Sequence, residues 1–255
     1  MIIFDTTTHP HIALITIDRP EKYNAMTPDM AQQLIEAVTA IDADDNIRVA
    51  VITGTGAKAF CCGSDIETLD DYATPWEFRN RTDYCDALRA MRKPIIAAVN
   101  GYALGGGLEL TLICDIRIAA ANAKFGAPEI KLGWVGGGGM VPFLMNSVGQ
   151  SNAATMIFTG DPITAEKALA WGLISQVVEP DALMDSALEL AATIAARAPI
   201  AAQCGKAYLR AAQSMPLEDA IRYERDLQAV CMATEDATEG RTAFKEKRAA
   251  KFVGR

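Results

Sequence analysis

Histidine is almost absent from this sequence. The 255 residues include two histidines, His9 and His11, and both lie within the first dozen positions. A Ser-His-Asp triad or a histidine-rich metal site in the body of the chain is therefore excluded, because each needs a histidine there. We interpret the His-x-His pair as the end of a strand.

Positive charge is also scarce. The chain has 24 lysines and arginines against 32 aspartates and glutamates, a net charge of −8. A nucleic-acid surface needs a basic excess or a basic stripe to neutralise phosphates. The one local basic cluster lies at residues 245–251, so the sequence argues against a nucleic-acid partner.

Long apolar runs and paired cysteine motifs are missing as well. No run approaches the roughly 18 uncharged apolar residues of a membrane span. The cysteines form no C-x-x-C pair and no secretory signal precedes them; they are Cys61, Cys62, Cys85, Cys114, Cys204 and Cys231. We therefore expect a cytoplasmic protein with reduced thiols and no association with a membrane.

Apolar residues make up half of the sequence, enough to bury the core of one large domain, with or without an appended piece. Strand-like runs are expected at 2–8, 11–17, 48–53, 94–99, 115–119 and 174–178. Helical patterns are expected at 28–41, 75–91, 140–148, 153–158, 164–171, 181–198, 201–213 and 217–232, with a tail helix beyond 234. Strands recurring between helices predict stacked β-β-α turns followed by a helical region.

The most informative stretch is residues 100–109 (NGYALGGGLE), which separates an apolar strand from an apolar helix. Glu109 falls on an apolar helix face, where burial without a cation raises a carboxyl pKa or costs several kcal/mol. The glycines before it leave free N–H groups at a helix N-terminus, which suits a negative oxygen. The alternative is a structural glutamate that is hydrogen-bonded in the core or reaches solvent.

Three glycine-bearing stretches each include a polar or acidic residue. They are residues 62–65 (CGSD), 105–109 (GGGLE) and 128–139 (PEIKLGWVGGGG). Two backbone amides from the first two stretches would converge on one developing oxyanion, and two carboxyl groups would divide the proton transfers.

One motif points elsewhere. Residues 54–59 (GTGAKA) match the dinucleotide-binding pattern G-x-G-x-x-A through Gly54, Gly56 and Ala59. In a dinucleotide-binding fold this motif opens a long helix, whereas residues 60–65 (FCCGSD) break the chain again. We keep NAD binding as an alternative that a titration would test.

These stretches resemble the enoyl-CoA hydratase (crotonase) family over nearly the whole chain. The most specific matches are residues 60–66 (FCCGSDI), 100–109 (NGYALGGGLE) and 125–129 (FGAPE), in the family's order and with close to its spacing. The resemblance implies a crotonase-like α/β spiral of β-β-α turns over residues 1–195. It also implies a helical trimerisation region over 196–255, a trimer or dimer of trimers, and an acyl-CoA substrate.

The resemblance also implies roles for individual residues. The backbone amides of Ser64 and Gly106 match the oxyanion hole for the thioester oxygen, and Glu109 and Glu129 match the two catalytic glutamates of the hydratases. No metal or redox cofactor is needed, since coenzyme A is part of the substrate. The residues expected to bind the acyl-CoA are Lys22, Tyr23, Cys62, Ser64, Asp65, Ile66, Trp134, Gly137, Phe244 and Lys247. The last two lie on the tail helix and would come from a neighbouring subunit. The alternative is that this helix is solvated and does not contact CoA.

The sequence departs from the family pattern at three places. The usual Pro-Gly-Ala-Gly-Gly and Gln-Arg pair are replaced by 136–142 (GGGGMVP), Trp134 stands where smaller residues are common, and Ser64 replaces the usual alanine. Retention of both glutamates favours an enoyl-CoA hydratase. The alternatives are another reaction of the family, such as double-bond isomerisation or retro-aldol cleavage, and a catalytically silent binding homologue.

Overall fold

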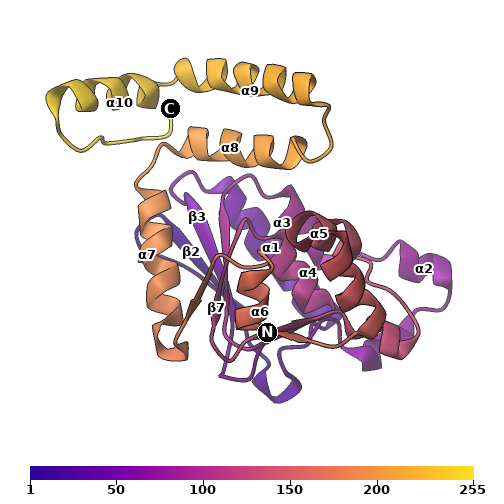
Figure 1. Cartoon of the computed structure of the whole chain (residues 1–255). Coiled ribbons are helices and arrows are strands. Elements are labelled where there is room, and N and C mark those ends of the chain that lie inside the picture. The colour runs from indigo at the N-terminus through magenta and orange to yellow at the C-terminus, as the bar shows by residue number, and fades with distance from the viewer.

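The computed structural model describes all 255 residues, Met1–Arg255, and its largest sheet has six strands (Figure 1). In sheet order they are β1 (Ile2–His9), β2 (Ile12–Ile17), β3 (Val49–Gly54), β5 (Ile95–Val99), β7 (Ile116–Ala120) and β10 (Gln176–Val178). β1 and β2 pair antiparallel, and the other pairs are parallel. Every residue of β3 and β5 is buried, as expected for parallel strands covered on both faces.

A second sheet of four short strands was not expected from the sequence. Its strands are β4 (Ala59–Cys61), β6 (Tyr102–Leu104), β8 (Lys124–Gly126) and β9 (Ile163–Thr164). Strands of two or three residues are too short to show an alternating pattern. β4, β6 and β8 are parallel, so their carboxyl ends lie along the same edge of the sheet.

The two sheets are built by a repeating path that confirms the expected β-β-α turns. β3, β5 and β7 are each followed by one strand of the second sheet and then by helical segments. The helical segments are η2 (Ile66–Asp71), α2 (Pro75–Arg79) and α3 (Tyr84–Ala90) in the first turn, α4 (Gly106–Ile113) in the second, and η3 (Pro128–Leu132) and α5 (Met140–Thr159) in the third.

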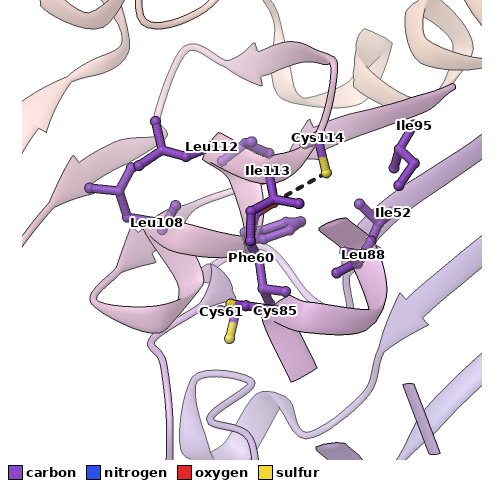
Figure 2. Close-up of a cluster of buried hydrophobic side chains, with 14 of the residues drawn as sticks. Ile52, Phe60, Cys61, Cys85, Leu88, Ile95, Leu108, Leu112, Ile113 and Cys114 are labelled. Carbon is purple, nitrogen blue, oxygen red and sulfur yellow. Dashed lines mark hydrogen bonds between the residues drawn. The ribbon is translucent and has the colours of Figure 1, made fainter. Parts of the chain in front are cut away.

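α4 lies at the centre of the main hydrophobic core. Every residue from Gly107 to Ile113 is buried, and Figure 2 shows Ile113 of α4 beside Phe60 of β4. A Cβ atom on Gly107 would lie 1.9 Å from the carbonyl oxygen of Cys61, so only glycine permits this approach of α4 to β4. Gly107 therefore allows α4 to pack directly against β4.

Of two helices expected from the sequence, the one over 28–41 is confirmed and the one over 75–91 is divided into two. α1 (Pro28–Ala43) is capped by Thr27, whose side chain accepts a hydrogen bond from the Met30 N–H at 3.2 Å. A single helix over 75–91 was wrong, because the chain breaks between α2 and α3. Asp83 accepts a hydrogen bond from the Cys85 N–H at 2.9 Å and starts a new helix there.

The G-x-G-x-x-A motif does not open a helix. Strand β4 begins at Ala59, the last residue of the motif. A Cβ atom on Gly54 would lie 2.4 Å from the carbonyl oxygen of Phe60, which explains this glycine by close backbone packing. The structural context that a dinucleotide-binding motif requires is therefore missing.

The last third of the chain is helical. Its helices are α6 (Ala165–Ala170), α7 (Leu183–Ala195), α8 (Pro199–Ala211), α9 (Leu217–Met232) and α10 (Glu235–Glu246). A 3-10 turn, η4 (Pro180–Ala182), precedes α7, and another, η1 (Pro20–Lys22), lies near the N-terminus. α7 covers the six-stranded sheet, while α8, α9 and α10 extend beyond it (Figure 1). None of the helices combines the length and apolar character that crossing a bilayer requires.

Candidate active site

Three loops leave the second sheet at the same edge, after β4, β6 and β8. A Cβ atom on Gly63 would lie 2.8 Å from the Gly106 amide nitrogen, and one on Gly105 would lie 3.0 Å from Glu129 Oε1. Gly63 and Gly105 have φ angles of +90° and +56°, which glycine adopts most easily. The parallel strands thus bring together three stretches that are far apart in the sequence.

The amides of Ser64 and Gly106 are free of strand and helix partners for different reasons. The Met26 N–H donates to the Gly63 carbonyl and the Asp65 N–H donates to the Met26 carbonyl, both at 2.8 Å. In this parallel bridge the intervening N–H of Ser64 points away from Met26. Gly106 is the first residue of α4, where helical N–H groups have no partner within the helix.

Both residues line a cavity of about 410 Å³. Eight of the residues expected at the site line it: Cys62, Ser64, Ile66, Gly106, Glu109, Glu129, Trp134 and Gly137. The loops after β4, β6 and β8 all contribute to this set, so the cavity lies where the three strand ends meet.

Glu109 is held in the cavity wall by the glycine run. Its side chain is buried, with the residue 5% exposed, and Oε1 accepts hydrogen bonds from the Gly138 N–H at 2.7 Å and the Met140 N–H at 3.1 Å. Burial raises the pKa of Glu109 from 4.5 to about 7, and the charge of Glu129 adds to the rise. Glu109 is therefore poised to gain or lose a proton near neutral pH.

Glu129 enters the same cavity from the start of η3. Its Oε2 atom is buried and has no hydrogen-bond partner. Burial also raises the pKa of this carboxyl group. An unpartnered carboxyl oxygen is costly in a folded protein, and such exceptions concentrate at functional sites.

Three of the expected CoA-binding residues lie next to the cavity and not in its lining. The Tyr23 carbonyl accepts a hydrogen bond from the Cys62 N–H at 3.2 Å, and Lys22 Nζ lies 3.3 Å from Glu67 Oε1. Asp65 pairs with Arg19 Nη1 at 2.7 Å, a contact that lowers the pKa of Asp65. Tyr23 and Asp65 therefore support the loop that contains Cys62 and Ser64, whereas the Lys22 pair is exposed.

Phe244 and Lys247 are not brought to the cavity within one chain. Phe244 is 85% exposed on α10, and Lys247 ends that helix with a left-handed backbone. Figure 1 shows α10 at the end of the molecule opposite α2, away from the cavity lining.

The sequence analysis missed a wall of the cavity built from α2, α3 and the link between them. This wall contributes Phe78, Arg81, Asp83 and Tyr84. Asp83 lies directly before the first residue of α3, and an aspartate at that position is an N-cap signal that would have revealed the break. The amides of Gly138 and Met140 were also missed as partners of Glu109. No group of three or more His, Cys, Asp or Glu side chains is arranged to hold a metal ion.

Sequence comparison agrees with this geometry. The profile described as enoyl-CoA hydratase/isomerase matches residues 7–255. An (E)-benzylidenesuccinyl-CoA hydratase from Thauera aromatica is 43% identical over 249 residues, with 96% of each chain covered. A 2,3-dehydroadipyl-CoA hydratase from Escherichia coli is 40% identical over 245 residues, again with 96% of each chain covered.

Solved structures show the same fold. An enoyl-CoA hydratase from Bacillus anthracis superposes with a TM-score of 0.92 at 33% identity, covering 100% of this chain and 99% of that one. An enoyl-CoA hydratase from Mycobacterium tuberculosis gives a TM-score of 0.92 at 31% identity, with the same coverage. Ser64, Gly106, Glu109 and Glu129 line one cavity. Together with the full-length likenesses, this leads to one conclusion: the chain belongs to the enoyl-CoA hydratase/isomerase family.

Proposed function

We propose that the chain is an enoyl-CoA hydratase, which adds water reversibly across the C2=C3 double bond of a 2-enoyl-CoA thioester. The observation that supports this most strongly is the presence of Glu109 and Glu129 in one cavity with the amides of Ser64 and Gly106. The relatives named as hydratases of enoyl-CoA thioesters support the same reaction.

The proposed mechanism begins at the thioester oxygen. The Ser64 and Gly106 amides donate hydrogen bonds to it and stabilise the enolate that forms when water adds at C3. Each such donor contributes about 10²–10³ in rate in other oxyanion holes. Because the donors are backbone groups directly after neighbouring parallel strands, the fold positions them before the charge develops.

The two glutamates divide the proton transfers. Glu109, fixed by the Gly138 and Met140 amides, orients the water and accepts its proton. Glu129, with an unpartnered oxygen and a raised pKa, delivers a proton to C2. Burial raises the pKa of both carboxyl groups, and the charge of Glu129 adds to the rise at Glu109, which favours proton exchange with water and substrate. No metal or redox cofactor takes part.

The test is turnover of crotonyl-CoA by the purified protein. Hydration removes the double bond conjugated to the thioester, so its ultraviolet absorbance falls. We expect this loss together with a 3-hydroxybutyryl-CoA product. An isomerised or cleaved product from another acyl-CoA, with crotonyl-CoA left intact, would instead establish one of the other reactions of the family. Tight CoA-thioester binding with no turnover of any of them would establish a silent homologue.

We further propose that residues 1–195 form the catalytic core and that residues 196–255 are the oligomerisation region of a trimer or dimer of trimers. Apolar side chains exposed on the last three helices support this proposal: Leu209, Leu217, Val230, Met232 and Phe244. In such an assembly Phe244 and Lys247 of one subunit would reach the CoA of its neighbour. The acidic net charge supports an enzyme without a nucleic-acid partner. Six free cysteines support a cytoplasmic location.

A further inference from the structure

The active-site cavity shares a polar wall with a second cavity. The second one has a volume of about 310 Å³, and five residues line both: Ser64, Leu69, Arg81, Asp83 and Tyr84. Four of these five are polar. An unsubstituted alkyl chain gains most from an apolar lining, so this wall is poorly matched to a substrate of that kind.

Arg81 is the only lysine or arginine that lines either cavity. Its guanidinium carbon lies 4.3 Å from the centre of the Phe78 ring. Nη1 donates to the Phe78 carbonyl at 2.9 Å, and Nη2 donates to Asp83 Oδ2 at 3.0 Å. The stacking and these two bonds fix the orientation of the group, and they leave three of its five N–H donors for another partner.

The same guanidinium lies beside the glycine run 136–139. A Cβ atom on Gly137 would lie 3.4 Å from Arg81 Nη2, and Gly137 belongs to the glycine run that holds Glu109. The Arg81 side chain is 22% exposed, so the charge is largely withdrawn from water. Asp83 balances the charge of Arg81 in the structure, and a substrate anion would share the Arg81 guanidinium with Asp83.

Two hydroxyl groups add donors to the same wall. The Tyr84 hydroxyl lies 3.3 Å from Ser64 Oγ, and a Cβ atom on Gly106 would lie 2.1 Å from it. The tyrosine oxygen is therefore placed between the two residues whose amides form the proposed oxyanion hole. Burial raises the pKa of Tyr84 well above 10, so the phenol remains a donor.

We propose that the preferred substrate is a 2-enoyl-CoA whose acyl group has a second carboxylate, bound by Arg81. This inference rests on the proposed function and specifies its substrate class. The flat guanidinium fork matches the two oxygens of a carboxylate, and a charged hydrogen bond is strong in a cavity withdrawn from water. The alternative is a purely structural role, in which Arg81 links Phe78 to Asp83 and binds no substrate.

The test compares two thioesters of equal chain length, 2-hexenoyl-CoA and 2,3-dehydroadipyl-CoA, which differ at the chain end. The readout is the ratio of kcat/KM for the carboxylated thioester to that for the methyl-ended one. The wild-type protein is expected to favour the carboxylated thioester. Arg81→Met is expected to lower this ratio about 10- to 150-fold, the loss of one hydrogen bond to a charged group.

Two further variants make the result specific. Asp83→Asn retains an oxygen that can cap α3 and removes the competing anion, so it is expected to raise the ratio. Arg79→Met removes an exposed arginine at the end of α2, two residues before Arg81. Arg79 lines neither cavity, so this variant is expected to leave the ratio as in the wild type.

The possible outcomes separate the carboxylate site from the hydratase proposal. A wild-type ratio near one, or an Arg81→Met protein that loses activity on both thioesters in proportion, would overturn the carboxylate site and leave the hydratase proposal standing. Failure of the wild-type protein to hydrate either of these thioesters or crotonyl-CoA would overturn the hydratase proposal and this inference with it.

Discussion

Glu109 is the residue at which function and stability conflict. Its carboxyl group is buried in the wall of the cavity, and its pKa in the folded chain is about 7 instead of 4.5. A carboxyl group whose folded pKa is raised binds its proton more tightly in the native state. Its contribution to stability is therefore present at acidic pH and is lost as the pH rises through 7.

This sign gives a prediction for Glu109→Gln, which keeps the shape and the hydrogen-bond acceptor but cannot ionise. The free energy of unfolding of the variant relative to wild type is expected to rise by about 3 kcal/mol between about pH 4.5 and pH 8, from the 2.5-unit difference at about 1.36 kcal/mol per unit. Urea denaturation at several pH values measures this difference. A difference independent of pH would show that Glu109 ionises as easily in the folded chain as in the unfolded one.

Glu129→Gln tests the second carboxyl group. Because Glu129 Oε2 has no partner in the folded chain, the exchange is expected to leave folding and CoA binding intact. Turnover is expected to fall by at least about 10²-fold, the usual contribution of a positioned acid or base. Crotonyl-CoA kinetics and a CoA-binding titration separate the two effects, and undiminished turnover would remove Glu129 from the mechanism.

At the scale of single residues, glycine runs next to acidic residues are visible as motifs. The family resemblance then selected Glu109, Glu129, Ser64 and Gly106, which all line one cavity, and their roles remain predictions. The sequence was insufficient for Arg81 and Tyr84. These residues belong to a segment that was predicted as one helix, and the break between α2 and α3 turns them toward the cavity. That break depends on local capping, which periodicity alone does not reveal.

Among the elements, the second sheet matters most for the site. Its strands have two or three residues, yet β4, β6 and β8 place the three loops at one edge. The longer strands of the first sheet were predictable from continuous apolar runs such as β3 and β5. The shorter ones were not, because their pairing is determined by long-range contacts that a local pattern does not contain.

The contact between α4 and β4 is expected to be intolerant of a single methyl group. Gly107→Ala would place Cβ 1.9 Å from the Cys61 carbonyl oxygen, so the helix must shift. Overpacking of this kind costs about 1–3 kcal/mol or more, and the shift would separate the two amide-bearing loops.

Gly205→Ala is the matched control, because nothing lies within 4 Å of a Cβ atom at that position in α8. This control is expected to stabilise the protein by up to about 1 kcal/mol through helix propensity. Thermal unfolding and crotonyl-CoA turnover measure both variants. An active, fully stable Gly107→Ala protein would contradict the close packing of α4 on β4.

For the whole molecule, the attachment of the C-terminal helices depends on a buried cation. Lys206 of α8 is 4% exposed, and its Nζ lies 2.8 Å from Asp115 Oδ2 and 2.6 Å from the Lys93 carbonyl oxygen. The sequence predicted that these helices follow the spiral. It did not predict this attachment, because a lysine on a helix is ordinarily solvated.

Lys206→Met is therefore expected to lower the free energy of unfolding by about 3–5 kcal/mol, since it leaves Asp115 without its cation. Lys245→Met, at an exposed position of α10, is the control and is expected to change it by less than about 0.5 kcal/mol. Urea denaturation at one fixed protein concentration compares the two. Equal stabilities would show that α8 does not depend on the buried pair.

The central claim is that two amides from separate loops bind one thioester oxygen between two glutamates. A crystal structure of the Glu129→Gln protein with bound 2-enoyl-CoA tests it most directly. We expect the thioester oxygen within about 3.2 Å of both the Ser64 and Gly106 nitrogens, with C2 and C3 facing Glu109 and position 129. A thioester oxygen bound to other donors, or an acyl chain that lies outside the cavity, would contradict the account.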